Sequence, residues 1–142
     1  GQIAVAGLAE EMPEFQKAVK AAGGRAVPLR VSGGFHSPFM AEAAERFGEV
    51  LRKAELQEPK LPLYSNYTGK PYAGDAAELL EQQICNPVRW EMIIRDMIAE
   101  GVDTFYEVGP GSTLSGLIAK IDSSVRCFSV SDAQSLKEVT VC

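Results

Sequence analysis

Apolar residues recur every three or four positions in five stretches of the chain, the spacing that places them on one face of an α-helix. These stretches are residues 10–22, 37–56, 75–85, 90–100 and 112–121. Helix-end signals support them, because a Gly-Gly pair follows the first stretch and Asp75 forms a capping-box pattern with Glu78 at the start of the third. A second capping-box pattern, Ser131-x-x-Gln134, predicts a sixth helix near the end of the sequence.

Short apolar runs between these stretches predict strands at residues 2–6, 26–29, 63–66, 104–108 and 125–130. Pro28 confines the second of them to a sheet edge or a bulge. Because strands alternate with helices through short glycine-bearing turns, the sequence predicts an α/β fold with a mainly parallel sheet and flanking helices. Ligands of such sheets bind at the carboxyl ends of strands. The loops at His36, Asn66 and Gly109 all follow predicted strands, so this pattern allows them to share one face.

Size and composition fit one globular domain: 142 residues, of which 46% are hydrophobic and 23% charged. The net charge of −5, without a Lys/Arg cluster, argues against a nucleic-acid partner. No apolar run is long enough to span a membrane, and no basic segment precedes the apolar N-terminal residues as it does in a signal peptide. We therefore expect a soluble, cytoplasmic protein.

The three cysteines, Cys85, Cys127 and Cys142, are an odd number and are widely spaced. This spacing predicts a reducing compartment and neither a disulfide framework nor a metal site. A single histidine and the absence of a Cys-x-x-Cys pair also argue against zinc. We expect no metal site.

The stretch Val-Ser-Gly-Gly-Phe-His-Ser-Pro-Phe-Met contains the only histidine of the chain. Gly33 and Gly34 permit backbone angles that other residues resist, which allows a sharp turn before His36. Ser37 is a favourable N-cap, and Pro38 suits the first position of a helix. The sequence therefore predicts that His36 lies on a tight loop at a helix N-terminus. Since imidazole can take and give a proton near neutrality, His36 is a candidate catalytic base, with a structural histidine as the equal alternative.

Two other features have a chemical and a structural interpretation. The glycine-rich turn at residues 107–111 could hold a phosphate on backbone N–H groups, but it lacks the lysine of a phosphate-binding loop, which favours a structural turn. Cys85 could be a thiol nucleophile with His36 as its base. Its position at the end of an apolar helix face favours a packed thiol instead.

Three polar residues near the ends of predicted elements each have two possible roles. Gln83 and Asn66 could each orient an imidazole, although a cap or turn residue is the commoner role for both. Arg89, beside Trp90, could bind an anion, whereas a surface ion pair or a packing role is commoner.

Four segments resemble, in order and at similar spacing, the family of malonyl-CoA:acyl-carrier-protein transacylases of the bacterial type. They are residues 1–7, 34–37 (Gly-Phe-His-Ser), 83–90 (Gln-Ile-Cys-Asn-Pro-Val-Arg-Trp) and 107–117 (Glu-Val-Gly-Pro-Gly-Ser-Thr-Leu-Ser-Gly-Leu). The resemblance extends to about residue 136. It implies an α/β-hydrolase-like acyltransferase core over residues 32–142, preceded by part of a small ferredoxin-like subdomain over residues 1–31.

The resemblance also implies a reaction: malonyl passes from coenzyme A to a serine and then to the phosphopantetheine thiol of acyl carrier protein, in fatty acid biosynthesis and without a cofactor. His36 matches the base that activates the serine. Gln83 matches the residue whose backbone carbonyl orients that histidine. Phe35 matches a bulky ring that disfavours an α-methyl branch on the acyl group, a discrimination of about 1–3 kcal/mol.

The sequence departs from the family at one important point, because it contains no Gly-x-Ser-x-Gly nucleophile elbow. By resemblance, the nucleophile, the oxyanion hole and the carboxylate-binding arginine lie upstream of what Gly1 matches. We expect the C-terminal part of the enzyme, inactive alone, with the missing N-terminal part or a second copy covering its core. The alternatives are a non-catalytic module that binds acyl carrier protein and an acyltransferase domain of a polyketide synthase.

Overall fold

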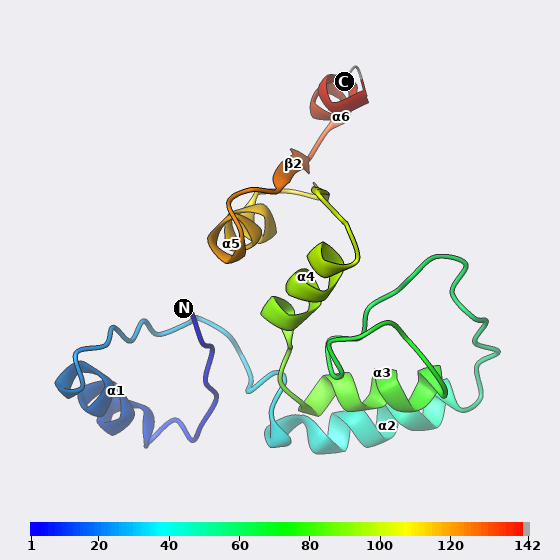
Figure 1. Cartoon of the computed structure of the whole chain (residues 1–142). Helices are drawn as coiled ribbons and strands as arrows, with labels where there is room; N and C mark the ends of the chain where they lie inside the picture. Colours follow the sequence, from blue (N-terminus) through cyan, green and yellow to red (C-terminus); the bar gives the residue numbers. More distant parts are fainter. Residues whose placement is uncertain (141–142) are drawn as a thin grey trace. The chain divides into compact units, whose positions relative to one another are not determined.

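The computed structural model describes residues 1–140, which form two compact units. Unit 1 consists of Gly1–Lys60 and Ala73–Val88, and unit 2 consists of Leu61–Tyr72 and the chain from Arg89 onward. Figure 1 follows the chain by colour through both units. The family-based boundary at residue 31 falls inside unit 1. This boundary stays a prediction.

Unit 1 contains α1 (Met12–Ala21), the 3₁₀ helix η1 (Pro38–Met40), α2 (Ala41–Leu51) and α3 (Ala76–Cys85). α2 and α3 lie side by side (Figure 1). Gly48 makes this approach possible, because a Cβ on it would stand 1.8 Å from Oε2 of Glu81. Arg52 Nη1 lies 2.8 Å from the same oxygen, and this ion pair joins the two helices.

The helix predicted over residues 37–56 is shorter in the structure. Its first turn is η1, and α2 ends at Leu51, the last buried residue of its apolar face. Beyond that point the side chain of Leu56 is 45% exposed. Because most helical stability in proteins comes from burying an apolar face, the helix stops where burial stops.

The strands predicted at residues 2–6 and 26–29 are wrong: both segments lack regular structure. The side chains of Ile3 and Val27 are 90% and 60% exposed, so no described segment covers them. The apolar runs are present, but a strand also needs a neighbour for its backbone N–H and C=O groups. α1, between them, has no buried residue.

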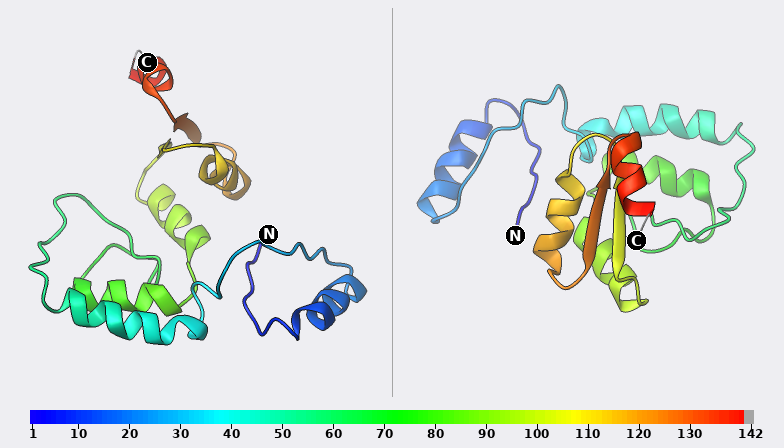
Figure 2. Two further views of the ribbon diagram at one scale, coloured as in Figure 1. Left: turned by 180° about the vertical axis from the view of Figure 1, so that it is seen from behind. Right: turned by 90° about the horizontal axis from the view of Figure 1, so that it is seen from above.

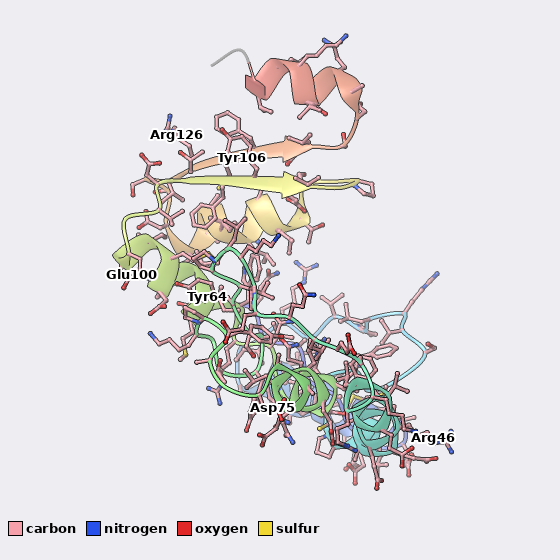
Figure 3. All side chains as sticks on the ribbon, turned by 90° about the vertical axis from the view of Figure 1, so that its right-hand side faces the viewer. Arg46, Tyr64, Asp75, Glu100, Tyr106 and Arg126 are labelled. Atoms are coloured by element: carbon pink, nitrogen blue, oxygen red, sulfur yellow. The ribbon has the colours of Figure 1, made fainter. Side chains whose placement is uncertain are left out.

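Unit 2 contains α4 (Trp90–Ala99), β1 (Thr104–Val108), α5 (Thr113–Ile121), β2 (Arg126–Val130) and α6 (Ala133–Thr140). β1 and β2 pair in parallel, with Thr104 opposite Arg126 and Val108 opposite Val130. α5 and α6 lie on opposite faces of this pair (Figures 2 and 3). A parallel sheet with flanking helices confirms the predicted α/β architecture.

The core of unit 2 lies where α4, α5 and the strands meet. Its buried side chains are Ile93, Ile94, Ile118 and Val130. The apolar stripe that predicted α4 therefore faces inward, as expected. No helix within residues 1–140 has the length and apolar character needed to cross a bilayer.

The strand predicted at residues 63–66 is reduced to one antiparallel bridge between Tyr64 and Pro71. Between them the chain makes a tight turn on Ser65, whose buried hydroxyl accepts from the backbone N–H groups of residues 67 and 68, at 3.2 and 3.4 Å. Lys70 forms an ion pair with Asp96 of α4, and its ammonium group holds the pKa of that carboxyl below the usual value. The turn is thereby fixed to α4.

The N-cap of α6 lies one residue beyond the predicted position. Asp132 Oδ1 accepts from the N–H groups of Gln134 at 3.0 Å and Ser135 at 2.8 Å. Ser135 Oγ in turn accepts from the Asp132 N–H at 3.0 Å. The capping box is therefore Asp132-x-x-Ser135 rather than one headed by Ser131, since the acceptor must lie two to three residues before the N–H groups it caps.

Candidate active site

The loop that carries His36 is held in an unusual backbone conformation. His36 has φ +57°, and among residues 1–140 it is the one non-glycine residue at positive φ. Gly33 and Gly34, which the sequence predicts as the turning residues, do not have positive φ. Gly34 is needed for another reason, because a Cβ on it would stand 2.9 Å from Cδ2 of Phe39. A left-handed conformation costs a non-glycine residue about 1–2 kcal/mol.

Ser37 holds the two sides of this loop together. Its hydroxyl donates a hydrogen bond to the carbonyl of Gly34 and accepts one from the Phe39 N–H at 3.3 Å. Pro38 follows as the first residue of η1. The predicted N-cap is confirmed, and the same side chain also ties the residues before His36 to those after it.

The imidazole of His36 reaches across the sequence to α3. Its Nδ1 lies 2.8 Å from the backbone carbonyl oxygen of Gln83, 47 residues away. A carbonyl can only accept, so Nδ1 carries the proton and the neutral ring keeps a lone pair on Nε2. His36 is exposed, and within the described chain Gln83 is the partner of its ring. The arrangement orients the imidazole and leaves Nε2 open to take a proton.

α3 presents this carbonyl because both ends of the helix are fixed. At its start, Asp75 Oδ1 accepts from the Ala77 and Glu78 N–H groups at 2.8 and 3.3 Å, as the capping-box pattern predicts. At its end, Asn86 Nδ2 donates to the backbone carbonyl of Gln82 at 2.9 Å. The carbonyl that faces His36 therefore lies in a well-defined last helical turn.

The structure gives Cys85 a packing role. Its thiol is half-buried and lies 3.9 Å from the carbonyl of Gln82, and Asn86 Nδ2 lies 3.5 Å from Sγ. The imidazole contacts α3 through the Gln83 carbonyl instead. These contacts favour the packed thiol over the thiol nucleophile.

Phe35 lies next to His36 and is 55% exposed. Its ring is close to Gly33, where a Cβ would stand 3.8 Å from Cζ. Its role in acyl selection stays a prediction.

In the turn between β1 and α5, the carboxylate of Glu107 accepts hydrogen bonds from the start of α5. Glu107 Oε1 accepts from the Leu114 N–H at 3.0 Å, and Oε2 accepts from the Ser115 N–H at 2.7 Å. The Ser115 and Leu114 N–H groups hold the pKa of Glu107 below its usual value. Because a carboxylate of the chain fills the position that a bound phosphate would take, these contacts favour the structural interpretation of this turn.

Arg89 and Asn66 also have structural roles. The Arg89 backbone N–H donates to the carbonyl of Asn66 at 2.9 Å, and Arg89 Nε donates to the carbonyl of Tyr67 at 2.8 Å. The guanidinium group thus binds a backbone carbonyl of its own unit. Of the two residues that sequence reasoning considered for orienting the imidazole, Gln83 makes the contact, and it does so through its main chain.

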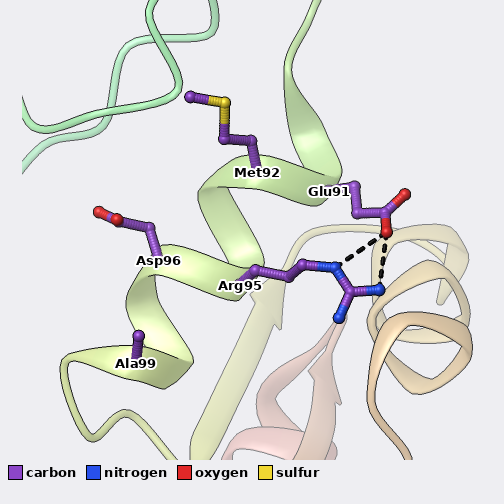
Figure 4. A pocket seen from close by; sticks show the side chains of 5 residues that line it. All are labelled: Glu91, Met92, Arg95, Asp96 and Ala99. Atoms are coloured by element: carbon purple, nitrogen blue, oxygen red, sulfur yellow. Dashed lines mark hydrogen bonds and ion pairs between the residues drawn. The ribbon is translucent and has the colours of Figure 1, made fainter.

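An open hollow lies on α4, and Figure 4 shows the side chains that line it: Glu91, Met92, Arg95, Asp96 and Ala99. Arg95 donates to Glu91 Oε1 from Nε at 2.9 Å and from Nη2 at 2.7 Å. Asp96 is paired with Lys70. Each charged side chain at this hollow therefore has an ion-pair partner, Arg95 with Glu91 and Asp96 with Lys70. Within residues 1–140, no group of three His, Cys, Asp or Glu side chains could hold a metal ion.

No protein-family model matches the chain, but individual relatives do. The chain is 39% identical over 140 residues to the malonyl CoA-acyl carrier protein transacylase of Bacillus subtilis, a match that covers 96% of this chain and 44% of the relative. The crystal structure of the corresponding enzyme from Clostridium perfringens superposes with a TM-score of 0.88 at 36% identity, over 92% of this chain and 42% of that one.

A third relative was solved with a partner. A malonyl-transacylase in complex with its type II polyketide acyl-carrier protein superposes with a TM-score of 0.82 at 33% identity, over 91% of this chain and 43% of that one. The chain spans less than half the length of each of these relatives.

Proposed function

The chain belongs to the malonyl CoA-acyl carrier protein transacylase family, and from this premise we propose that it supplies His36 as the general base of malonyl transfer. The observation that carries the proposal is the 2.8 Å contact between His36 Nδ1 and the Gln83 carbonyl. It leaves Nε2 of an exposed imidazole as the proton acceptor, which is the arrangement that a base acting on a hydroxyl requires.

The reaction takes place in two halves. Nε2 takes the proton of a serine hydroxyl, the serine oxygen attacks the thioester carbonyl of malonyl-CoA, and the departing coenzyme A thiolate receives that proton from the imidazolium. In the second half, Nε2 takes the proton of the phosphopantetheine thiol, the sulfur attacks the acyl-serine, and the serine oxygen regains a proton. The Gln83 carbonyl accepts from Nδ1–H throughout and thus keeps the ring oriented.

The nucleophile belongs to another part of the enzyme in this proposal. The sequence has no Gly-x-Ser-x-Gly elbow, and the chain matches 44% of the Bacillus subtilis relative. Residues 1–31 contribute to a ferredoxin-like subdomain, and Phe35 limits branching next to the acyl carbonyl. Malonyl-CoA and acyl carrier protein are the substrates, no cofactor takes part, and the reaction is cytoplasmic. The solved complex of a relative with its acyl-carrier protein supports the acceptor.

A chimera tests the proposal. The segment of the Bacillus subtilis enzyme that this chain matches is replaced by the chain, and the mass of acyl carrier protein is followed after addition of malonyl-CoA. We expect malonylated carrier from the chimera and no acyl-enzyme on the 142-residue chain alone. A folded chimera that transfers no malonyl would contradict the proposed function, and acylation of the chain alone would contradict the external nucleophile. Ser123→Ala, at an exposed position, is the matched control.

A polyketide carrier protein is the second candidate acceptor, because one relative was solved with such a partner. Competition between a fatty-acid carrier and a type II polyketide carrier for the malonylated chimera separates the two. Preferential malonylation of the polyketide carrier would favour the second candidate.

A further inference from the structure

The Gln83 carbonyl is available to His36 because of the residue four positions later. In an α-helix the carbonyl of residue i accepts from the N–H of residue i+4. For Gln83 that residue is Pro87, which has no N–H to donate. The helical ladder of α3 therefore has no backbone donor for this carbonyl at position 87.

Pro87 also ends the helix. Asn86, just before it, has φ −117° and ψ 155°, whereas α3 runs only to Cys85. These angles fall in the extended region to which a proline confines the preceding residue. The proline thus acts twice: it supplies no donor, and it prevents Asn86 from continuing the helix.

The neighbouring carbonyl, that of Gln82, has a local side-chain donor in place of a helical N–H. The Gln82 carbonyl accepts locally, from Asn86 Nδ2 at 2.9 Å, and the Cys85 thiol lies 3.9 Å away. The Gln83 carbonyl instead accepts from His36 Nδ1, 47 residues away. Two adjacent carbonyls at one helix end therefore have different uses, a local cap and an imidazole acceptor.

We propose that Pro87 is a positioning residue that reserves the Gln83 carbonyl for His36 Nδ1–H and so keeps the proton off Nε2. Pro87 touches no reacting atom and acts through Gln83. The inference rests on the proposed function of His36 only where it concerns catalysis. The hydrogen bond between the imidazole and the Gln83 carbonyl can be tested without any activity.

The variant Pro87→Ala tests it in the full chain. The substitution would free Asn86 to become helical and would bring an N–H to the Gln83 carbonyl, in competition with the imidazole. His36 is the only histidine, so ¹⁵N-histidine labelling gives a single set of ring signals whose shifts report the tautomer. At a pH where the ring is neutral, we expect the ratio of Nδ1–H to Nε2–H tautomer to fall about fivefold, the effect of one ordinary hydrogen bond. Pro87→Ser supplies the same N–H and is expected to give the same change.

Two controls separate the new N–H from the loss of the proline ring. Pro59→Ala removes an exposed proline of the same unit and is expected to leave the tautomer ratio unchanged. N-methylalanine at position 87, introduced by ligation at Cys85, removes the ring without adding an N–H and is expected to keep the ratio of the unmodified chain.

Two results would overturn the inference: a tautomer ratio in Pro87→Ala and Pro87→Ser equal to that of the unmodified chain, or an equal fall with N-methylalanine. Neither bears on malonyl transfer by the chimera, so the failure of this inference and the failure of the proposed function are distinguishable. Circular dichroism of each variant verifies that it is folded before the tautomer is compared.

Discussion

The loop at residues 31–40 and the turn at residues 107–115 both combine glycines with a helix start, yet they differ in how they satisfy their polar groups. In the turn, the carboxylate of Glu107 accepts from two N–H groups of α5 only seven and eight residues away. In the loop, the imidazole of His36 depends on a carbonyl 47 residues away, and the residue is exposed. The turn is complete by itself, whereas the loop needs α3 and leaves one polar atom available for chemistry.

Backbone strain separates the same two regions. Gly109 and Gly111 have φ +141° and +96°, which cost glycine little. His36 has φ +57°, where a side chain is costly. The strain in the loop persists because the hydroxyl of Ser37 and the carbonyl of Gln83 hold His36 from both sides. Strained residues of this kind cluster at functional sites, which agrees with the role proposed for His36.

The largest expected difference between the two regions is in catalysis. In the chimera, His36→Ala should lower the rate of malonyl transfer about 10²- to 10⁴-fold, the usual contribution of a general base. Glu107→Gln should leave the rate within a few-fold of the parent, since the carboxylate caps a helix. Rates are measured from malonylated carrier protein by mass spectrometry. Equal losses in the two variants would remove the distinction between the regions.

Glycine substitutions should separate the two regions by stability. Gly111→Ala places a side chain at φ +96° and should lower the free energy of unfolding by about 1–2 kcal/mol. Gly33→Ala should change it by no more than about 0.5 kcal/mol, because a Cβ there meets only the Phe35 ring at 3.8 Å. Urea denaturation of the 142-residue chain measures both. A large loss for Gly33→Ala would mean that the loop, too, depends on special glycine angles.

A smaller effect should reveal the strain at His36 itself. His36→Gly and His36→Ala both remove the imidazole, so the difference between them reports the backbone alone. The glycine variant should be more stable by about 1 kcal/mol, because glycine adopts φ +57° without the side-chain penalty. Urea denaturation measures the difference. Equal stabilities would show that the loop relaxes once the ring is gone.

The smallest expected effect is a pH dependence confined to acid. The Ser115 N–H holds the pKa of Glu107 below its usual 4.5, so the ionised carboxyl stabilises the fold above pH 4.5 and this stabilisation is lost as the pH falls through the lowered pKa. Below about pH 5, the unfolding free energy of Glu107→Gln should therefore fall less steeply than that of the parent. Denaturant titrations across this pH range compare the two slopes, and parallel curves would mean that the carboxylate is not the cap.

Sequence patterns correctly predicted the helices and strands whose signal lies within their own residues. The stripe that includes Ile93 and Ile94 gave α4, and the apolar runs at residues 104–108 and 125–130 gave a parallel pair. The segments at residues 2–6 and 26–29 have the same apolar character but no partner within the described chain. Strand pairing depends on residues far away in the sequence, and a single segment does not report them.

The site shows the same limit. Ser37 and Pro38 revealed the helix start beside His36, because caps are local signals. The residues alone left Gln83 and Asn66 as two candidates for orienting the imidazole, and only the family resemblance indicated the backbone carbonyl of Gln83. By itself, the Asn86-Pro87 pair is a helix-break signal, and α3 does end at Cys85. The rule that a proline at i+4 leaves a carbonyl without its donor was the available signal for its second role.

α1 illustrates what the absence of buried residues means for a helix. It has ten residues, a length at which a helix is marginal by itself, and none of them is buried. Its amide protons should therefore exchange with deuterated solvent through local unfolding of this segment alone. Those of α4 should exchange only when a larger part of the structure unfolds. Within one chain, the amide protons of the two helices should thus exchange at very different rates.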